Sequence, residues 1–247
     1  MVLTAFRGAV GFLSRAPVGQ DKDSWNAFRS TPTSFPLAGY PIGLVLALPF
    51  VLPISGPFTA FAFVTLIYIV TGIPHADAIA DLGDAAVVHG PPDERQTVMQ
   101  DTTVGVGAVL ALGLVLLGLW TVGLQLSSLT LGVLGLVVTA EVGAKLAMAT
   151  IACLGTPAHE GLGSAVADDH GPRSLVLPIV AALPAAAFTW PNPAAAIGLV
   201  GAFAAALVML AWASRRLGGV SGDVMGGANE LARLAALLTG VIVWTHS

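Results

Sequence analysis

The sequence predicts an all-α, polytopic integral membrane protein that forms one membrane-embedded domain over residues 1–247. Its composition is the first reason, because 55% of the 247 residues are hydrophobic and only 10% are charged, with a mean hydropathy of +0.85. A soluble domain carries about 25% charged residues. The second reason is the pattern, in which long apolar segments alternate with a few polar ones. One cysteine excludes an internal disulfide, and the net charge of −4 does not indicate nucleic-acid binding.

Residues 1–30 are too polar to span a bilayer. Their apolar residues recur at helical spacing, at Val2, Phe6, Val10 and Leu13, with arginines nearby. Such a pattern is typical of a short amphipathic helix that lies in the membrane interface. A signal peptide fits less well, because the apolar run is short and has no obvious small-residue cleavage site. We therefore expect an interfacial N-terminal segment.

Seven apolar segments follow, and about seven transmembrane helices are expected from them. They are 37–55, 56–73, 104–125, 130–153, 174–190, 194–214 and 232–246. About 20 residues cross the roughly 30 Å hydrocarbon core of a bilayer, and somewhat shorter spans are tolerated. Segments 37–55 and 174–190 contain prolines, so their limits are the hardest to predict.

The charges predict the topology. Long polar loops at 74–103, 154–173 and 215–231 share one side with the N-terminus and carry nearly all arginines. The opposite side receives short uncharged turns and the C-terminus. By the positive-inside rule the side with the long loops is cytoplasmic. We expect a multi-pass protein of the cell membrane whose functional site faces the cytoplasm.

The loop at 74–103 is the first candidate site. Pro74 suits the first turn of a helix, and from there Asp77, Asp81 and Asp84 follow at i, i+4 and i+7. They would lie within roughly 60° of each other on one helix face. Three aligned carboxylates repel one another unless a cation lies between them, and Mg²⁺ takes oxygen ligands of this kind. We predict a metal site here; the alternative is a solvated acidic helix that marks the membrane boundary.

Two other residues of this loop are candidates for chemistry. Asp101 lies just before the third apolar segment, within reach of the aspartate face if the loop folds back. His75 is compatible with a general base, a substrate contact or a structural histidine at a helix start.

The later loops add glycines and acids. Glu160, Gly161 and Gly163 belong to a glycine-rich loop that could bring backbone N–H groups close to a phosphate. Gly222 permits a tight turn and Asp223 adds a carboxylate on the same side of the membrane. Solvated surface is the simpler interpretation of three further residues, Asp168, Asp169 and His170.

Glu141 and Lys145 lie one helical turn apart inside the fourth apolar segment. An ionisable pair within a span faces the protein interior and is by default a functional hypothesis. The alternative is an ion pair that only neutralises itself. Lys145 is nearer the cytoplasmic end, where it could contact a phosphate.

Taken together, these stretches resemble the cobalamin-5′-phosphate synthase family, also called adenosylcobinamide-GDP ribazoletransferase. The strongest match is His75-Ala76-Asp77-Ala78-Ile79-Ala80-Asp81-Leu82-Gly83-Asp84, similar to the family's His-Leu-Asp-Gly-x-x-Asp-x-x-Asp signature. Residues 99–105, 160–163 and 218–223 follow in the family's order. Ala78, Gln100 and Ser221 depart from the usual Gly, basic residue and Thr, but no carboxylate is lost.

The resemblance implies a Mg²⁺-dependent transferase that joins adenosylcobinamide-GDP to α-ribazole or its 5′-phosphate and releases GMP, late in coenzyme B12 synthesis. It implies that Asp77, Asp81 and Asp84 hold the metal, and that Asp84, Asp101 or His75 accepts the hydroxyl proton. Substrate or phosphate contacts would come from Lys145, Glu160, Gly161, Gly163, Gly222 and Asp223. A homo-oligomer or a complex with other cobalamin-pathway enzymes is compatible with this function.

Two alternatives belong to other classes. A CDP-alcohol phosphotransferase of phospholipid synthesis also uses aspartates and Mg²⁺, but its signature needs an arginine that is missing after Asp81. A secondary transporter usually binds its substrate near the bilayer midplane, whereas most acids here crowd one surface.

Overall fold

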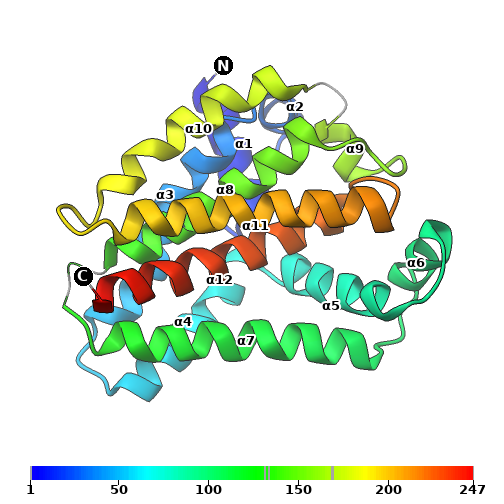
Figure 1. Cartoon of the computed structure of the whole chain (residues 1–247). Helices are drawn as coiled ribbons and strands as arrows, with labels where there is room; N and C mark the ends of the chain where they lie inside the picture. The colour runs from blue at the N-terminus through cyan, green and yellow to red at the C-terminus, as the bar shows by residue number, and fades with distance from the viewer. Residues whose placement is uncertain (1, 131, 133, 168–169, 247) are drawn as a thin grey trace.

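The computed structural model describes residues 2–130, 132, 134–167 and 170–246, and it is helical throughout apart from the connections (Figure 1). Asp168 and Asp169 lie outside the described residues. The α-helices are α1 Val2–Leu13, α2 Lys22–Arg29, α3 Ser34–Leu46, α4 Gly56–Thr71, α5 Pro74–Val87, α6 Pro92–Met99, α7 Val106–Ser127, α8 Leu134–Leu154, α9 Leu162–Ala167, α10 Val176–Ala182, α11 Ala194–Arg216 and α12 Gly222–His246. Shorter 3₁₀ turns are η1 Leu48–Val51, η3 Pro172–Leu175 and η4 Leu183–Ala187.

Helix α8 forms the centre of the molecule, and α3, α11 and α12 pack around it (Figure 1). All of its residues from Leu136 to Cys153 are buried, as expected for a helix that is apolar on every side. The approach of α3 is close, because a Cβ atom on Gly39 would lie 2.7 Å from the Cα atom of Val142. The centre of the bundle is therefore packed backbone against backbone.

Five helical segments are long and apolar enough to span a membrane, or six if the bent pair α4 and α5 forms one span. The five are Ser34–Val51, Val106–Ser127, Leu134–Leu154, Ala194–Arg216 and Gly222–His246. The all-α membrane class is confirmed, but the predicted number of seven is not. The expected span at 174–190 is divided among η3, α10 and η4, since prolines at 172, 178 and 184 each remove a backbone donor.

A bend of 99° separates α4 from α5. Gly72 has a φ of 78° and donates its N–H to the Tyr68 carbonyl, so it ends α4 in the left-handed conformation that glycine adopts readily. Pro74 then begins α5. Both helices pack against α7, and α5 also packs against α12 (Figure 1). The bend thus brings the aspartate-rich helix into the bundle.

The N-terminal segment is helical, as predicted, and its predicted apolar face is not packed as a whole inside the protein. Leu13 is buried, whereas Val2 is exposed. The small residues of α1 face α2 instead, and a Cβ atom on Gly8 would collide with the Ser24 carbonyl. Four rings from α1, α2 and α3 stack in one cluster, made of Phe12, Trp25, Phe28 and Phe35.

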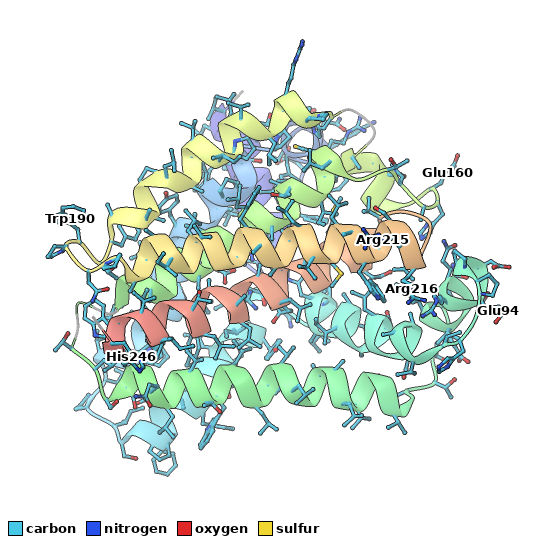
Figure 2. The ribbon with its side chains drawn as sticks, viewed as in Figure 1. Glu94, Glu160, Trp190, Arg215, Arg216 and His246 are labelled. Carbon is cyan, nitrogen blue, oxygen red and sulfur yellow. The ribbon has the colours of Figure 1, made fainter. Side chains whose placement is uncertain are left out.

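Two predicted loops are largely helical. The 74–103 loop contains α5 and α6. The 215–231 loop ends at residue 221, because α12 begins at Gly222, ten residues before the predicted span. The polar residues of 222–231 are mostly buried, so their polarity marks an internal network rather than a solvated loop. Figure 2 shows Glu94, Glu160, Arg215 and Arg216 at one end of the bundle, and Trp190 and His246 at the opposite end. These four charged residues, from three different connections, therefore lie together at one end.

Candidate functional site

A cavity of about 260 Å³ brings together four of the predicted site residues: His75, Gly163, Gly222 and Asp223. His75 comes from the first turn of α5, Gly163 from α9, and the other two from the first turn of α12. Apolar side chains from α1, α3 and α8 complete the lining. The bend after α4 and the start of α12 therefore build this cavity from segments that lie far apart in the sequence.

The glycines of the predicted phosphate loop have different roles. A Cβ atom on Gly163 would lie 2.7 Å from the backbone nitrogen of Gly222, so Gly163 allows α9 to pack against the start of α12. Gly222 itself faces open space. Gly161 donates its N–H to the Ser164 hydroxyl and is exposed, like Glu160, outside the cavity lining. Only part of the predicted loop therefore lies at the cavity.

The loops around α9 and α12 are also joined by backbone hydrogen bonds. The N–H of Val220 donates to the Thr156 carbonyl, and the N–H of Ala158 donates to the Val220 carbonyl, which forms a short parallel bridge. Gly218, with a φ of 74°, makes the turn that precedes it. This pairing holds Asp223 in the first turn of α12. There Asp223 lines both the 260 Å³ cavity and a smaller cavity of about 80 Å³.

One acidic side chain of α5, Asp81, lies within electrostatic range of Asp223. Asp81 is half-buried and experiences the like charges of Asp77, Asp223 and Asp84. In the part of the chain that the structure describes, these four carboxylates take part in no salt bridge with a protein cation. An acidic group of this kind is stabilised when a cation neutralises it. The arrangement adds Asp223 to the predicted trio.

Asp84 has a structural role. One of its carboxylate oxygens accepts the N–H of Gly105 at 2.7 Å and the other accepts the N–H of Ala108 at 2.9 Å. These groups belong to the N-terminus of α7, where backbone donors lack helical partners and the helix dipole favours a negative charge. Asp84 therefore fastens α5 to the start of α7.

Asp101 lies away from the cavity lining, in the exposed connection between α6 and α7. Hydrogen bonds from the Thr103 side chain and backbone lower the pKa of the Asp101 carboxyl. The Thr103 N–H to Asp101 distance is 2.9 Å. A lowered pKa makes this carboxylate a weaker proton acceptor, which reduces its suitability as a general base.

Glu141 and Lys145 form the predicted ion pair, but they belong to a larger buried network. Arg233 of α12 donates from its Nε to Glu141 at 2.7 Å and also pairs with Glu230. The side chains of all four residues are at most 1% exposed. Two acids and two bases balance in charge, and buried ions are tolerated only when they are paired in this way.

Lys145 reaches the cavity indirectly. Its Nζ donates to the Oδ1 of Asn229 at 2.8 Å, and the Nδ2 of Asn229 lies 3.1 Å from the Nδ1 of His75. Because Lys145 is fully buried, the structure does not support the predicted direct phosphate contact of this residue. The chain Lys145–Asn229–His75 connects the buried network with the cavity wall.

The site residues predicted from the sequence do not include Asn229, Glu230 or Arg233. The first two lie in what was predicted to be a loop, and Arg233 lies just inside the last predicted span. A signal was present, because Glu141 and Lys145 would need partners inside the bundle, and Arg233 is a charged residue in an apolar segment. Only the contact between α8 and α12 shows that these groups meet.

The carboxylates of α5 and α12 have the oxygen chemistry that Mg²⁺ prefers. Their unbalanced charge fits a cation as well. As placed, however, the described residues include no group of three or more His, Cys, Asp or Glu side chains positioned to hold a metal ion. Metal binding by Asp77, Asp81 and Asp84 stays a prediction, and Asp84 would have to share its oxygens with α7.

The fold and the site define a helical integral membrane protein with a mostly apolar cavity, lined by His75 and Asp223, beside the aspartate-bearing helix α5. Comparison with known families makes the class specific. The family model described as Cobalamin-5-phosphate synthase matches residues 5–241, and the chain belongs to this family. No solved structure matches the chain.

Similar proteins share its whole length. Adenosylcobinamide-GDP ribazoletransferase of Halorubrum lacusprofundi is 50% identical over 100% of both chains. The protein of that name in Haloquadratum walsbyi is 46% identical over 99% of both, and the one in Methanocella arvoryzae is 31% identical over 98% of this chain and 97% of its own. Family membership supports the predicted resemblance over both alternatives, the CDP-alcohol phosphotransferase and the transporter.

Proposed function

We propose that this protein transfers the adenosylcobinamide phosphate group of adenosylcobinamide-GDP to α-ribazole, or to α-ribazole 5′-phosphate, with release of GMP. The family match over residues 5–241 is the observation that carries the proposal. The names of the full-length relatives support the two substrates. In this reaction a ribazole hydroxyl attacks the phosphorus on the cobinamide side, the diphosphate bond breaks, and GMP leaves.

The cavity beside α5 and α12 is the proposed reaction site. It joins the family's His75 signature with Gly222 and Asp223 in one space. Asp223 lines the cavity and its charge acts on Asp81 of α5, while Asp77 and Asp81 lie outside the lining. We place the diphosphate near these carboxylates, with a cation between the two sets of negative charge.

Mg²⁺ is the proposed cation, held by Asp77 and Asp81 with help from Asp84 or Asp223. When bound, it would neutralise the diphosphate and the developing charge on GMP. The residues of the chain do the remaining work: Asp84 holds α5 against α7, and the apolar walls from α1, α3 and α8 exclude water from the cavity. Asp84, Asp101 and His75 were the three candidates to accept the hydroxyl proton. Asp84 already accepts two backbone N–H groups, so it is an occupied acceptor.

We further propose that the charged end of the bundle faces the cytoplasm of the cell membrane. Arg215 and Arg216 end α11 on this side, in agreement with the positive-inside rule. Water-soluble nucleotide substrates would then reach the cavity from the cytoplasm.

The test is turnover by the purified protein in nanodiscs. With adenosylcobinamide-GDP, α-ribazole or its 5′-phosphate, and Mg²⁺, we expect GMP and the cobalamin product to appear together, and EDTA to stop both. Asp77→Asn and Asp81→Asn should lower kcat by at least about 100-fold, because a lost metal ligand removes charge stabilisation in the transition state. Asp93→Asn, the same change at an exposed aspartate outside the cavity lining, is the matched control.

Absence of GMP release with either acceptor, from folded protein, would reject the proposed reaction. GMP release that continues in EDTA would reject only the proposed requirement for Mg²⁺. Normal turnover in both aspartate variants would reject the assignment of the metal to α5.

A further inference from the structure

The orientation of the Asn229 side chain is determined by its neighbours. Lys145 can only donate, so the Asn229 atom that it meets at 2.8 Å must be the amide oxygen. Glu230 is an acceptor when ionised, and it meets the amide nitrogen at 3.1 Å. A flipped amide would place donor against donor and acceptor against acceptor. The NH₂ group of Asn229 therefore also points at His75, 3.1 Å from Nδ1.

This orientation determines where the His75 ring carries its proton. An amide NH₂ cannot accept a hydrogen bond, so Nδ1 of His75 must accept, and it must be unprotonated. A neutral imidazole then carries its proton on Nε2. Within the described residues, Nε2 of His75 has no hydrogen-bond partner in the protein. The ring lines the cavity, so this free N–H group is available to a ligand there.

The rest of the buried network keeps this arrangement in place. Lys145 is held by Glu141, and Glu141 is held in turn by Arg233, which also pairs with Glu230. These side chains are at most 1% exposed, so water does not compete for their hydrogen bonds. The network therefore gives Asn229 a fixed donor, Lys145 of α8, and a fixed acceptor, Glu230 of α12.

We propose that His75 acts in the reaction as a hydrogen-bond donor, through Nε2–H, to a phosphate oxygen of the substrate, and that Lys145 and Asn229 are positioning residues that fix its tautomer. This proposal rests on the proposed function, because it takes the cavity as the place where the diphosphate binds. It assigns His75 a role different from a general base: a ring that already holds a proton on Nε2 cannot accept one there.

The tautomer can be measured without turnover. Protein labelled with ¹⁵N-histidine in nanodiscs gives separate nitrogen signals for the two ring positions, and the His75→Gln variant identifies those of His75. At neutral pH we expect Nε2 to be protonated and Nδ1 not. The exposed His89, whose ring makes no hydrogen bond within the described residues, serves as an internal reference for an unconstrained ring. A proton on Nδ1 of His75 would overturn the proposal.

The functional role is tested by two conservative variants. The amide nitrogen of glutamine can occupy the position of Nε2, whereas that of asparagine lies near the position of Nδ1. We expect His75→Gln to keep kcat/KM for adenosylcobinamide-GDP within about tenfold of wild type. His75→Asn should lose about 10- to 100-fold, the usual cost of a lost hydrogen bond to a charged group. Equal loss in both folded variants would overturn the donor role.

Failure of the proposed function is distinguishable from failure of this inference. If the wild-type protein releases no GMP, the proposed reaction is wrong, and the nitrogen signals of His75 still decide the tautomer. If turnover is normal but Nδ1 carries the proton, only the present inference is wrong.

Discussion

At the scale of single residues, the aspartates of α5 divide into two kinds. Asp84 gives both carboxylate oxygens to backbone N–H groups at the start of α7. The Asp77 side chain is exposed and makes no hydrogen bond or ion pair within the described residues. The same residue type, two turns apart on one helix face, thus supports the fold at one position and is free for a ligand at the other.

This division predicts opposite effects of two substitutions. Asp84→Ala leaves two backbone donors without their acceptor, so we expect a loss of about 1–2 kcal/mol in unfolding free energy. Asp77→Ala should leave stability within about 0.5 kcal/mol, because it removes an unpaired charge at an exposed site. Unfolding of both variants in the same detergent measures the difference. A stable Asp84→Ala protein would show that the contact with α7 contributes little.

At the scale of helices, the packing of α3 against α8 depends on glycine. Cβ atoms on Gly39 and Gly43 would each lie 2.7 Å from an α8 Cα atom, closer than van der Waals contact allows. Two helices can approach this closely only where one of them carries no side chain at the crossing, and small residues serve this purpose in membrane proteins. Because α8 also carries Glu141 and Lys145, its position decides where the buried network forms.

Gly39→Ala is therefore expected to destabilise the protein by about 1–3 kcal/mol, since the added methyl group forces α3 away from α8. Gly113→Ala in α7 is the matched control, because a Cβ atom there meets nothing within 4 Å. It should leave stability unchanged or raise it by up to about 1 kcal/mol through its higher helix propensity. Thermal unfolding of the two variants compares them directly, and equal stability would contradict the close packing.

At the scale of the whole molecule, the two ends of the bundle differ. The charged end carries α6, the start of α12 and the end of α11, whereas Trp190 and the C-terminal His246 lie at the other end (Figure 2). An asymmetric distribution of arginines gives the protein a preferred orientation in the membrane. It also places the candidate site near a single face.

The orientation is open to a labelling experiment. Cys153 is buried, and its replacement by alanine provides a cysteine-free background. Single cysteines at Glu94 and Trp190, both exposed, should then react with a membrane-impermeant maleimide from opposite sides. We expect Trp190→Cys to react in intact cells, and Glu94→Cys to react only after the cytoplasmic face is opened. The reverse pattern would overturn the proposed orientation.

The local sequence pattern was sufficient to predict the class of protein and much of the acidic site. Composition alone requires a membrane protein, and the spacing from Pro74 to Asp84 correctly predicts one aspartate-bearing helix. These features depend on neighbours in the chain, so periodicity and capping rules reach them. The motif from His75 to Asp84 also carries the family resemblance that the comparisons confirm.

Tertiary structure decided the features that depend on contacts between distant segments. The 99° bend after Gly72, the division of segment 174–190 and the early start of α12 changed the count of spans. Lys145 contacts Asn229, and Asn229 contacts His75, which lies 154 positions away from it in the sequence. A buried charge is stable only beside its partner, and the identity of that partner is set by which helix faces pack together. Sequence spacing within a helix carries no information about that choice.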